Sequence, residues 1–174
     1  MSEPFSRPIR VEAIPRDGLE KRIEADEAER AAIAAFNRLP AVGKLAATFT
    51  LRHGGRGTVI VRGELSAEIT QTCVVTLEPF DASIEESIDL RFAPAVETPK
   101  PRGASVDESE AMMIGDESEP DPIVDGKIDL GAIASEFLTL NLDPYPRKPG
   151  AAFEAPKGDE DGSSSSPFSA LRKS

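Results

Sequence analysis

Histidine and cysteine are the side chains that most often serve as a base, a nucleophile or a soft metal ligand, and the chain has one of each, His53 and Cys73. His53 stands beside the glycine-rich residues 54–57, with no acidic neighbour in sequence to orient its ring, so we interpret it as a solvated turn residue. Cys73 continues the apolar side of an alternating segment, which indicates a small buried side chain. Neither residue is predicted to be catalytic.

Metal and phosphate sites are also not expected from the sequence. One histidine and one cysteine cannot supply a tetrahedral site of nitrogen and sulfur ligands. The acidic run Asp107–Glu110 lacks the glycine-pinned spacing of a calcium loop, and residues 54–57 lack the Lys-Ser/Thr ending of a phosphate loop. We therefore predict a protein that is not an enzyme, with no catalytic residue, metal, cofactor or small-molecule substrate.

The charge of the chain is concentrated in one stretch. The 174 residues carry a formal net charge of −11, and residues 97–126 alone hold nine acidic and two basic side chains. A net acidic protein has no long-range attraction to nucleic acid, so direct RNA contact would need a local basic patch. The single cysteine, and the lack of any apolar run long enough to cross a bilayer, predict a cytoplasmic protein without membrane association.

The middle of the chain is typical of antiparallel strands. Apolar and polar residues alternate over 45–51, 59–73 and 84–92, and short turns separate these segments. Three consecutive strands of this kind form a meander, and the long second strand is expected to bend or bulge near Gly63. We predict an α+β fold with a bent, mainly antiparallel sheet, for which a barrel-like form is a further option.

The two ends of this meander carry the other elements. A short strand is predicted at residues 9–13, a helix at 24–38 with Asp26 in a capping box, and a second helix at 130–142 with Asp129 as its cap. Both helices are expected to pack on the sheet. The side chains expected to face it are Ala25, Ala28, Ala32, Ile33 and Phe36 on the first helix, and Leu130, Ile133, Ala134, Phe137, Leu138 and Leu140 on the second.

One domain, residues 1–146, is predicted to contain all of these elements, with a disordered acidic insert at about 95–120. Residues 147–174 are predicted to be a flexible tail that ends in a candidate docking peptide, 167–173. The anchors of this peptide would be Pro167, Phe168 and Leu171. In the alternative interpretation, Phe168 and Leu171 fold back to cover an edge strand.

Three segments, in this order, resemble the YceD family of large ribosomal RNA accumulation proteins. They are Thr72–Phe80, Pro122–Leu130 and Ser166–Lys173. Members commonly have Cys-x-x-Cys before a Leu-Glu-Pro-Phe-like turn, whereas this chain has Thr76 in place of the second cysteine. A metal or redox role of paired cysteines therefore does not carry over. The motif residues singled out by the resemblance are Cys73, Leu77, Glu78, Pro79, Phe80, Asp129 and Leu130.

The resemblance implies a non-enzymatic role in the synthesis, processing or stability of 23S ribosomal RNA during large-subunit biogenesis. The partner would be a ribosomal RNA precursor or a large-subunit ribosomal protein. The acidic charge leaves an alternative open, in which the chain escorts a basic large-subunit protein without touching RNA. The turn at residues 73–80 has a structural interpretation as well, because Pro79 fixes its backbone while Leu77 and Phe80 anchor the hairpin.

Overall fold

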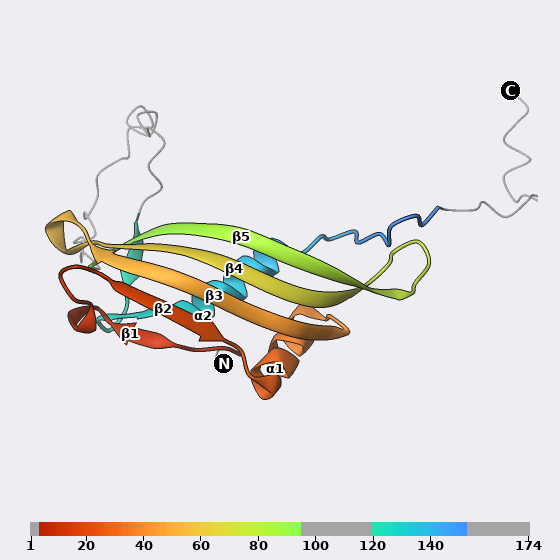
Figure 1. The fold of residues 1–174 in the computed structure, drawn as a ribbon, viewed down its shortest axis with the longest axis horizontal. Helices are drawn as coiled ribbons and strands as arrows, with labels where there is room; N and C mark the ends of the chain where they lie inside the picture. Colours follow the sequence, from red (N-terminus) through yellow and green to blue (C-terminus); the bar gives the residue numbers. More distant parts are fainter. Residues whose placement is uncertain (1–3, 95–119, 153–174) are drawn as a thin grey trace, which may run out of the picture.

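The computed structural model describes residues 4–94 and 120–152, which form an α+β fold (Figure 1). A five-stranded sheet has the order β2-β3-β4-β5-β6, antiparallel throughout except for the parallel pair β5 and β6. A separate pair, β1 and β7, is antiparallel. The bounds are β1 Pro8–Arg10, β2 Leu19–Glu24, α1 Glu27–Asn37, β3 Ala41–His53, β4 Val59–Thr72, β5 Pro79–Pro94, β6 Asp121–Ile123, β7 Lys127–Asp129 and α2 Leu130–Leu140.

The meander predicted from the alternating segments is confirmed as β3, β4 and β5, and the sheet of the described residues does not close into a barrel. One face of the sheet carries the core, because every second side chain of β4 points toward the helices. Ile33 of α1 and Leu138 of α2 belong to the same buried cluster. The buried β4 residues on this face are Val59, Val61, Leu65, Ala67, Ile69 and Gln71.

The opposite face of the sheet, which we call the open face, is polar. Between the buried positions β4 places Arg62, Glu64, Ser66 and Glu68 on this side, and no helix of the described residues covers them. Such a division into an apolar and a polar face is typical of an antiparallel sheet with one side in solvent. The open face is therefore available for contacts with other molecules.

The N-terminal part differs from the prediction. The expected strand at 9–13 is only β1, and a 3₁₀ turn at Val11–Ala13 follows it. β2 was not predicted from the sequence. Four of the six residues of β2 are charged, and its apolar residues Leu19 and Ile23 are four positions apart, which is a helical spacing. An edge strand can carry such a pattern because only one of its sides pairs with the sheet.

The first helix has the predicted capping box, but it begins at Glu27 and not at residue 24. Asp26 accepts a 2.9 Å hydrogen bond from the Glu29 backbone amide, while the Glu29 carboxylate accepts one of 2.9 Å from the Asp26 amide. The predicted packing stripe was wrong in part. Ile33 is buried together with Ala34, but Ala28 and Ala32 are exposed and 67% of Phe36 is exposed. The buried face of α1 is thus shifted by about one residue from the face expected. Ala25 is buried, but it precedes the start of the helix.

Of the bend or bulge expected near Gly63, the bulge is absent. The pairing of β4 with both neighbours is continuous there, and the irregularity lies on β3 between Val42 and Lys44. Gly63 has a packing reason instead, because a Cβ atom at this position would lie 2.6 Å from Cδ1 of Phe49. The ring of Phe49, directly opposite in the ladder, occupies the space that any larger residue would need.

The second helix has the predicted cap but a shorter apolar face. Asp129 Oδ1 accepts hydrogen bonds from the amides of Gly131 at 2.9 Å and Ala132 at 3.2 Å. Leu138 is buried, Phe137 is half-buried, and 71% of Leu140 is exposed, contrary to expectation. The helix ends at Leu140, so no further turn extends the buried face past Leu138. Most of the predicted acidic insert, 95–119, and the docking peptide 167–173 lie outside the described residues.

Candidate functional site

The turn between β4 and β5, residues 73–78, forms a closed hairpin tip. The Cys73 amide donates to the Glu78 carbonyl at 2.9 Å, and the Leu77 amide donates to the Cys73 carbonyl at 2.9 Å. Leu77 has φ of +59°, in the left-handed region that a non-glycine residue rarely adopts. The backbone therefore holds Leu77 in an unfavourable conformation, and its side chain is 76% exposed.

The Cys73 thiol is fully buried beneath this tip and accepts several hydrogen bonds. The hydroxyl of Thr76 donates to it, as do the backbone amides of Lys148, Thr76 and Val75, with a Lys148 nitrogen to Cys73 sulfur distance of 3.3 Å. These bonds favour the thiolate and lower the pKa of Cys73 to about 6, although burial of the sulfur acts in the opposite direction. The sulfur thus fixes the tip to a remote segment.

That segment, residues 143–148, follows α2 and lies against the hairpin tip; we call it the strap. The Val74 amide donates to the Pro146 carbonyl at 2.9 Å, and the Lys148 ammonium contacts the Glu78 carboxylate at 3.0 Å. The Gln71 side chain donates to the Asp143 carbonyl at 3.4 Å. These contacts join two parts of the chain about 70 residues apart in sequence.

Tip and strap together expose apolar side chains. Val74 is 45% exposed, Leu77 is 76% exposed and Tyr145 of the strap is 72% exposed. The 2.9 Å bond from the Val74 amide to the carbonyl of Pro146, the residue after Tyr145, brings this part of the strap next to the tip. Sequence reasoning singled out Leu77 through the family motif but missed Val74, Tyr145 and Lys148. The two prolines that flank Tyr145 were the only available signal, since proline favours an extended segment.

A model of the family described as large ribosomal RNA subunit accumulation protein YceD matches residues 61–173, more than half of the chain. The chain belongs to the YceD family. The family name implies involvement in the accumulation of the ribosomal RNA of the large subunit, and the YceD family is not a known enzyme family. Comparison of the chain with curated proteins and with solved structures gives no significant match.

The YceD match includes the hairpin tip, the strap and the start of α2. At the tip, the Thr76 hydroxyl donates a hydrogen bond to the Cys73 sulfur. Glu78 pairs with Lys148, while Pro79 and Phe80 begin β5. Within residues 4–94 and 120–152, no group of three or more His, Cys, Asp or Glu side chains could hold a metal ion. No helix in this part of the chain is both long and apolar enough to cross a membrane.

The other two motif residues lie away from the tip. Besides capping α2, Asp129 accepts a 2.6 Å hydrogen bond from the Arg7 amide, and Leu130 is buried in the core. The Arg7 guanidinium forms a two-fold ion pair with Glu29, at 2.6 and 2.9 Å, which lowers the pKa of Glu29 through that hydrogen bond. Asp129 and Leu130 therefore join the N-terminal segment to both helices, and the structure does not bring them near the tip.

His53, the other residue considered for chemistry, ends β3 and is exposed. Its Nε2 lies 2.9 Å from the Ile14 carbonyl oxygen, and Cys73 is at the opposite end of β4. The two residues therefore do not form a nucleophile and base pair.

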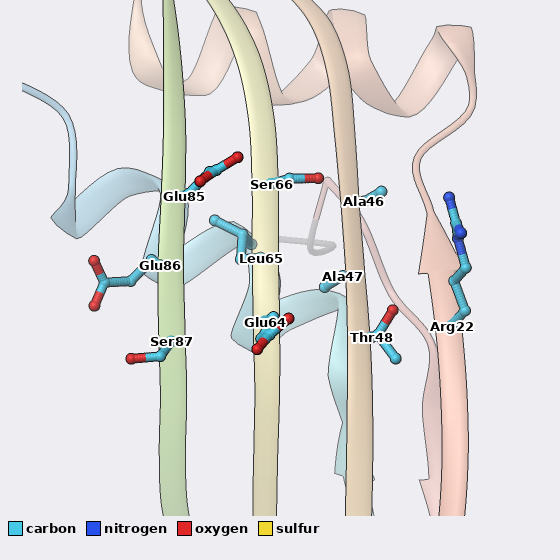
Figure 2. Close-up of a pocket in the computed structure, with 10 residues that line it drawn as sticks. All are labelled: Arg22, Ala46, Ala47, Thr48, Glu64, Leu65, Ser66, Glu85, Glu86 and Ser87. Carbon is cyan, nitrogen blue, oxygen red and sulfur yellow. The ribbon is translucent and has the colours of Figure 1, made fainter.

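The open face of the sheet forms a shallow depression of about 500 Å³ that sequence reasoning did not find (Figure 2). Figure 2 shows Glu64 and Ser66 of β4 between Thr48 of β3 and Glu85 and Ser87 of β5. These residues are brought together only by the strand register, so no continuous sequence motif predicts the depression. The hydroxyl and carboxylate groups can accept hydrogen bonds from a cationic ligand, but they include no base or nucleophile paired with an orienting partner.

Proposed function

We propose that this chain is a non-enzymatic cytoplasmic factor that supports the synthesis, processing or stability of 23S ribosomal RNA while the large ribosomal subunit is built. It acts by binding a component of the assembling subunit, either the ribosomal RNA precursor or a large-subunit protein. The observation that carries this proposal is the group of exposed apolar side chains on the hairpin tip and the strap, Val74, Leu77 and Tyr145, all within the residues that the YceD model matches.

Binding fits this surface better than catalysis does. Exposed apolar side chains that gather on a fixed support are typical of contact surfaces, since they gain from losing water when a partner covers them. The hydrogen bonds between tip and strap fix the backbone of the tip before a partner binds, which reduces the conformational entropy lost on binding. Leu77 keeps a left-handed conformation that would be unnecessary in a plain turn, where glycine or asparagine avoids the strain.

A second candidate function is that of an acidic escort for a basic large-subunit protein. The net charge of −11 favours capture of a basic protein over direct contact with phosphate. The terminal peptide with Pro167, Phe168 and Leu171 would provide a further docking element in either function. Crosslinking in cells, followed by identification of the attached molecule, distinguishes the two functions by yielding RNA or a protein.

The proposed surface is tested with Leu77→Asn, because asparagine tolerates the left-handed backbone and removes the apolar side chain. The matched control is Phe36→Asn on α1, which removes an exposed apolar residue away from the motif. We expect Leu77→Asn to lower 23S relative to 16S ribosomal RNA several-fold in cells that depend on the variant, with an unchanged melting temperature. Normal 23S levels at equal protein abundance, or an equal defect in Phe36→Asn, would contradict the proposal.

A further inference from the structure

One edge of β5 has no strand partner over most of its length. β4 pairs with β5 from Pro79 to Phe92, whereas on the other side β6 pairs only with Phe92–Pro94. Among the described residues, Pro79–Leu90 therefore presents a free hydrogen-bonding edge of twelve residues. Free edges of this length are uncommon in natural sheets because they invite pairing with another strand.

The strand register identifies the backbone groups that this edge offers. The Cys73 amide donates to the Glu78 carbonyl, so Cys73 and Glu78 form a hydrogen-bonded pair. Along an antiparallel ladder, hydrogen-bonded pairs alternate with non-hydrogen-bonded pairs, which fixes the type of every pair between β4 and β5. Opposed pairs of the non-hydrogen-bonded type turn their amide and carbonyl groups away from β4. The residues of β5 with outward backbone groups are Asp81, Ser83, Glu85, Ser87 and Asp89.

Side chains along this edge differ between its two sides. On the helix side, Phe80, Ile84 and Leu90 are apolar and only half-buried, so part of their surface stays uncovered. A strand that continues the sheet would cover them with apolar side chains of its own. Its alternate residues would then face the open side of the sheet.

The charge of the edge is acidic throughout. Pro79–Leu90 contains four acidic and no basic residues. Asp81 accepts a hydrogen bond from Thr70 and Asp89 pairs with Arg62, but Glu85 and Glu86 have no hydrogen bond or ion pair within the described residues. Figure 2 shows Glu86 on the side of β5 that faces away from β4, next to the free edge.

We propose that the free edge of β5 binds an extended, basic segment of a partner protein, which adds a strand to the sheet. Lysine or arginine residues of this segment meet the acidic side chains, while its apolar residues cover the half-buried ones on the helix side. A second copy of the chain is a poor occupant because two such edges would oppose their carboxylates, and RNA would bring phosphates to the same groups. The choice of a large-subunit protein as the partner rests on the proposed function, but the binding itself does not.

A pair of substitutions at one position tests the proposed edge. Proline in place of Ser87 removes an outward amide without removing a bond to β4, whereas Ser87→Ala retains the amide. The probe is a labelled synthetic peptide of about ten residues in which lysine alternates with valine. We expect the full-length chain and Ser87→Ala to bind it, and Ser87→Pro to bind at least about tenfold more weakly, with an unchanged melting temperature.

Charge and pattern are tested with the same assay. Glu85→Lys, on the open side of the sheet where the lysines of the peptide would lie, should weaken binding of the lysine peptide by about tenfold and should allow binding of the analogue with glutamate in place of lysine. A peptide of equal composition, with its lysines and valines in two blocks, should bind at least about tenfold more weakly than the alternating one.

Three results would overturn the inference: equal affinity of Ser87→Pro and Ser87→Ala, equal affinity for the alternating and block peptides, or no binding at all. Concentration-dependent self-association that Ser87→Pro abolishes would assign the edge to a second copy and would also refute it. These readouts use purified protein and peptide, whereas the proposed function is judged by 23S ribosomal RNA levels in the Leu77→Asn strain. Failure of the proposed strand addition at β5 is therefore distinguishable from failure of the proposed function.

Discussion

The two turns that flank β4 have similar backbone strain but different support. Arg56, in the turn between β3 and β4, has φ of +58°, and Leu77, in the turn between β4 and β5, has φ of +59°. The Arg56 turn is closed by local contacts, such as the 2.8 Å bond from the Gly54 amide to the Thr58 carbonyl. The Leu77 turn is also bound by the strap through Val74, Cys73 and Glu78.

This difference shows that a strained turn by itself does not make a site. Arg56 is exposed, polar and flanked by glycines, so its turn can adjust without exposing apolar surface. Leu77 is apolar and exposed on a turn that a remote segment fixes in place. Of the two turns, only the hairpin tip combines strain, apolar exposure and remote support, and the YceD family match includes the tip but not the Arg56 turn.

The largest expected effect comes from removal of the strap. Truncation after Leu142 removes the partners of Val74, Cys73 and Glu78 and exposes the thiol, so we expect a loss of about 2–4 kcal/mol in the free energy of unfolding. Truncation after Ser166 keeps the strap and is the matched control, for which urea unfolding should show no change. If both truncations unfold like the full chain, the strap does not support the tip and the comparison between the two turns fails.

A smaller effect concerns pH and is confined to the hairpin tip. The folded pKa of Cys73 is lowered to about 6 from an ordinary value of 9.0, so the thiolate stabilises the folded state fully above pH 9.0 and loses this contribution as the pH falls through about 6. The stability of the native chain relative to Cys73→Ala should therefore rise between pH 6 and pH 9. Urea unfolding at several pH values measures this difference.

The glycine-rich turn supplies the control for the pH effect. His53→Ala removes the ring that contacts Ile14 and leaves the thiol in place, so this variant should keep the rise in stability toward pH 9. A difference between the native chain and Cys73→Ala that stays constant with pH would show that the hydrogen bonds at the sulfur do not favour the thiolate.

Much of the sheet could be predicted because alternation is a local property of the sequence. The side chains of β3, β4 and β5 alternate over many residues, and Asp26 and Asp129 mark the helix starts through their capping chemistry. β2 could not be predicted because its charged residues are accommodated only at the sheet edge. The exposure of Phe36 depends on how α1 is rotated against β3, which tertiary packing decides.

The candidate site was predictable only in its local part. The motif from Cys73 to Phe80 is continuous in sequence and was found, but its support from Lys148 and Pro146 depends on where the chain returns after α2. The same limit applies to the open face, where Ser66 and Glu85 are neighbours through the strand register alone. Contacts between distant residues are set by the fold as a whole, and no residue spacing encodes them.

The smallest expected effect compares the strain of the two turns directly. Glycine adopts the left-handed conformation without a steric cost but loses more backbone entropy on folding, so Leu77→Gly and Arg56→Gly should each raise stability by at most about 1 kcal/mol. Equal gains in urea unfolding would show that the two backbones are strained alike. Only Leu77→Gly should also lower 23S ribosomal RNA in cells, because it removes an exposed apolar side chain from the tip. A loss of 23S ribosomal RNA in Arg56→Gly, or none in Leu77→Gly, would mean that the strained leucine has no special role.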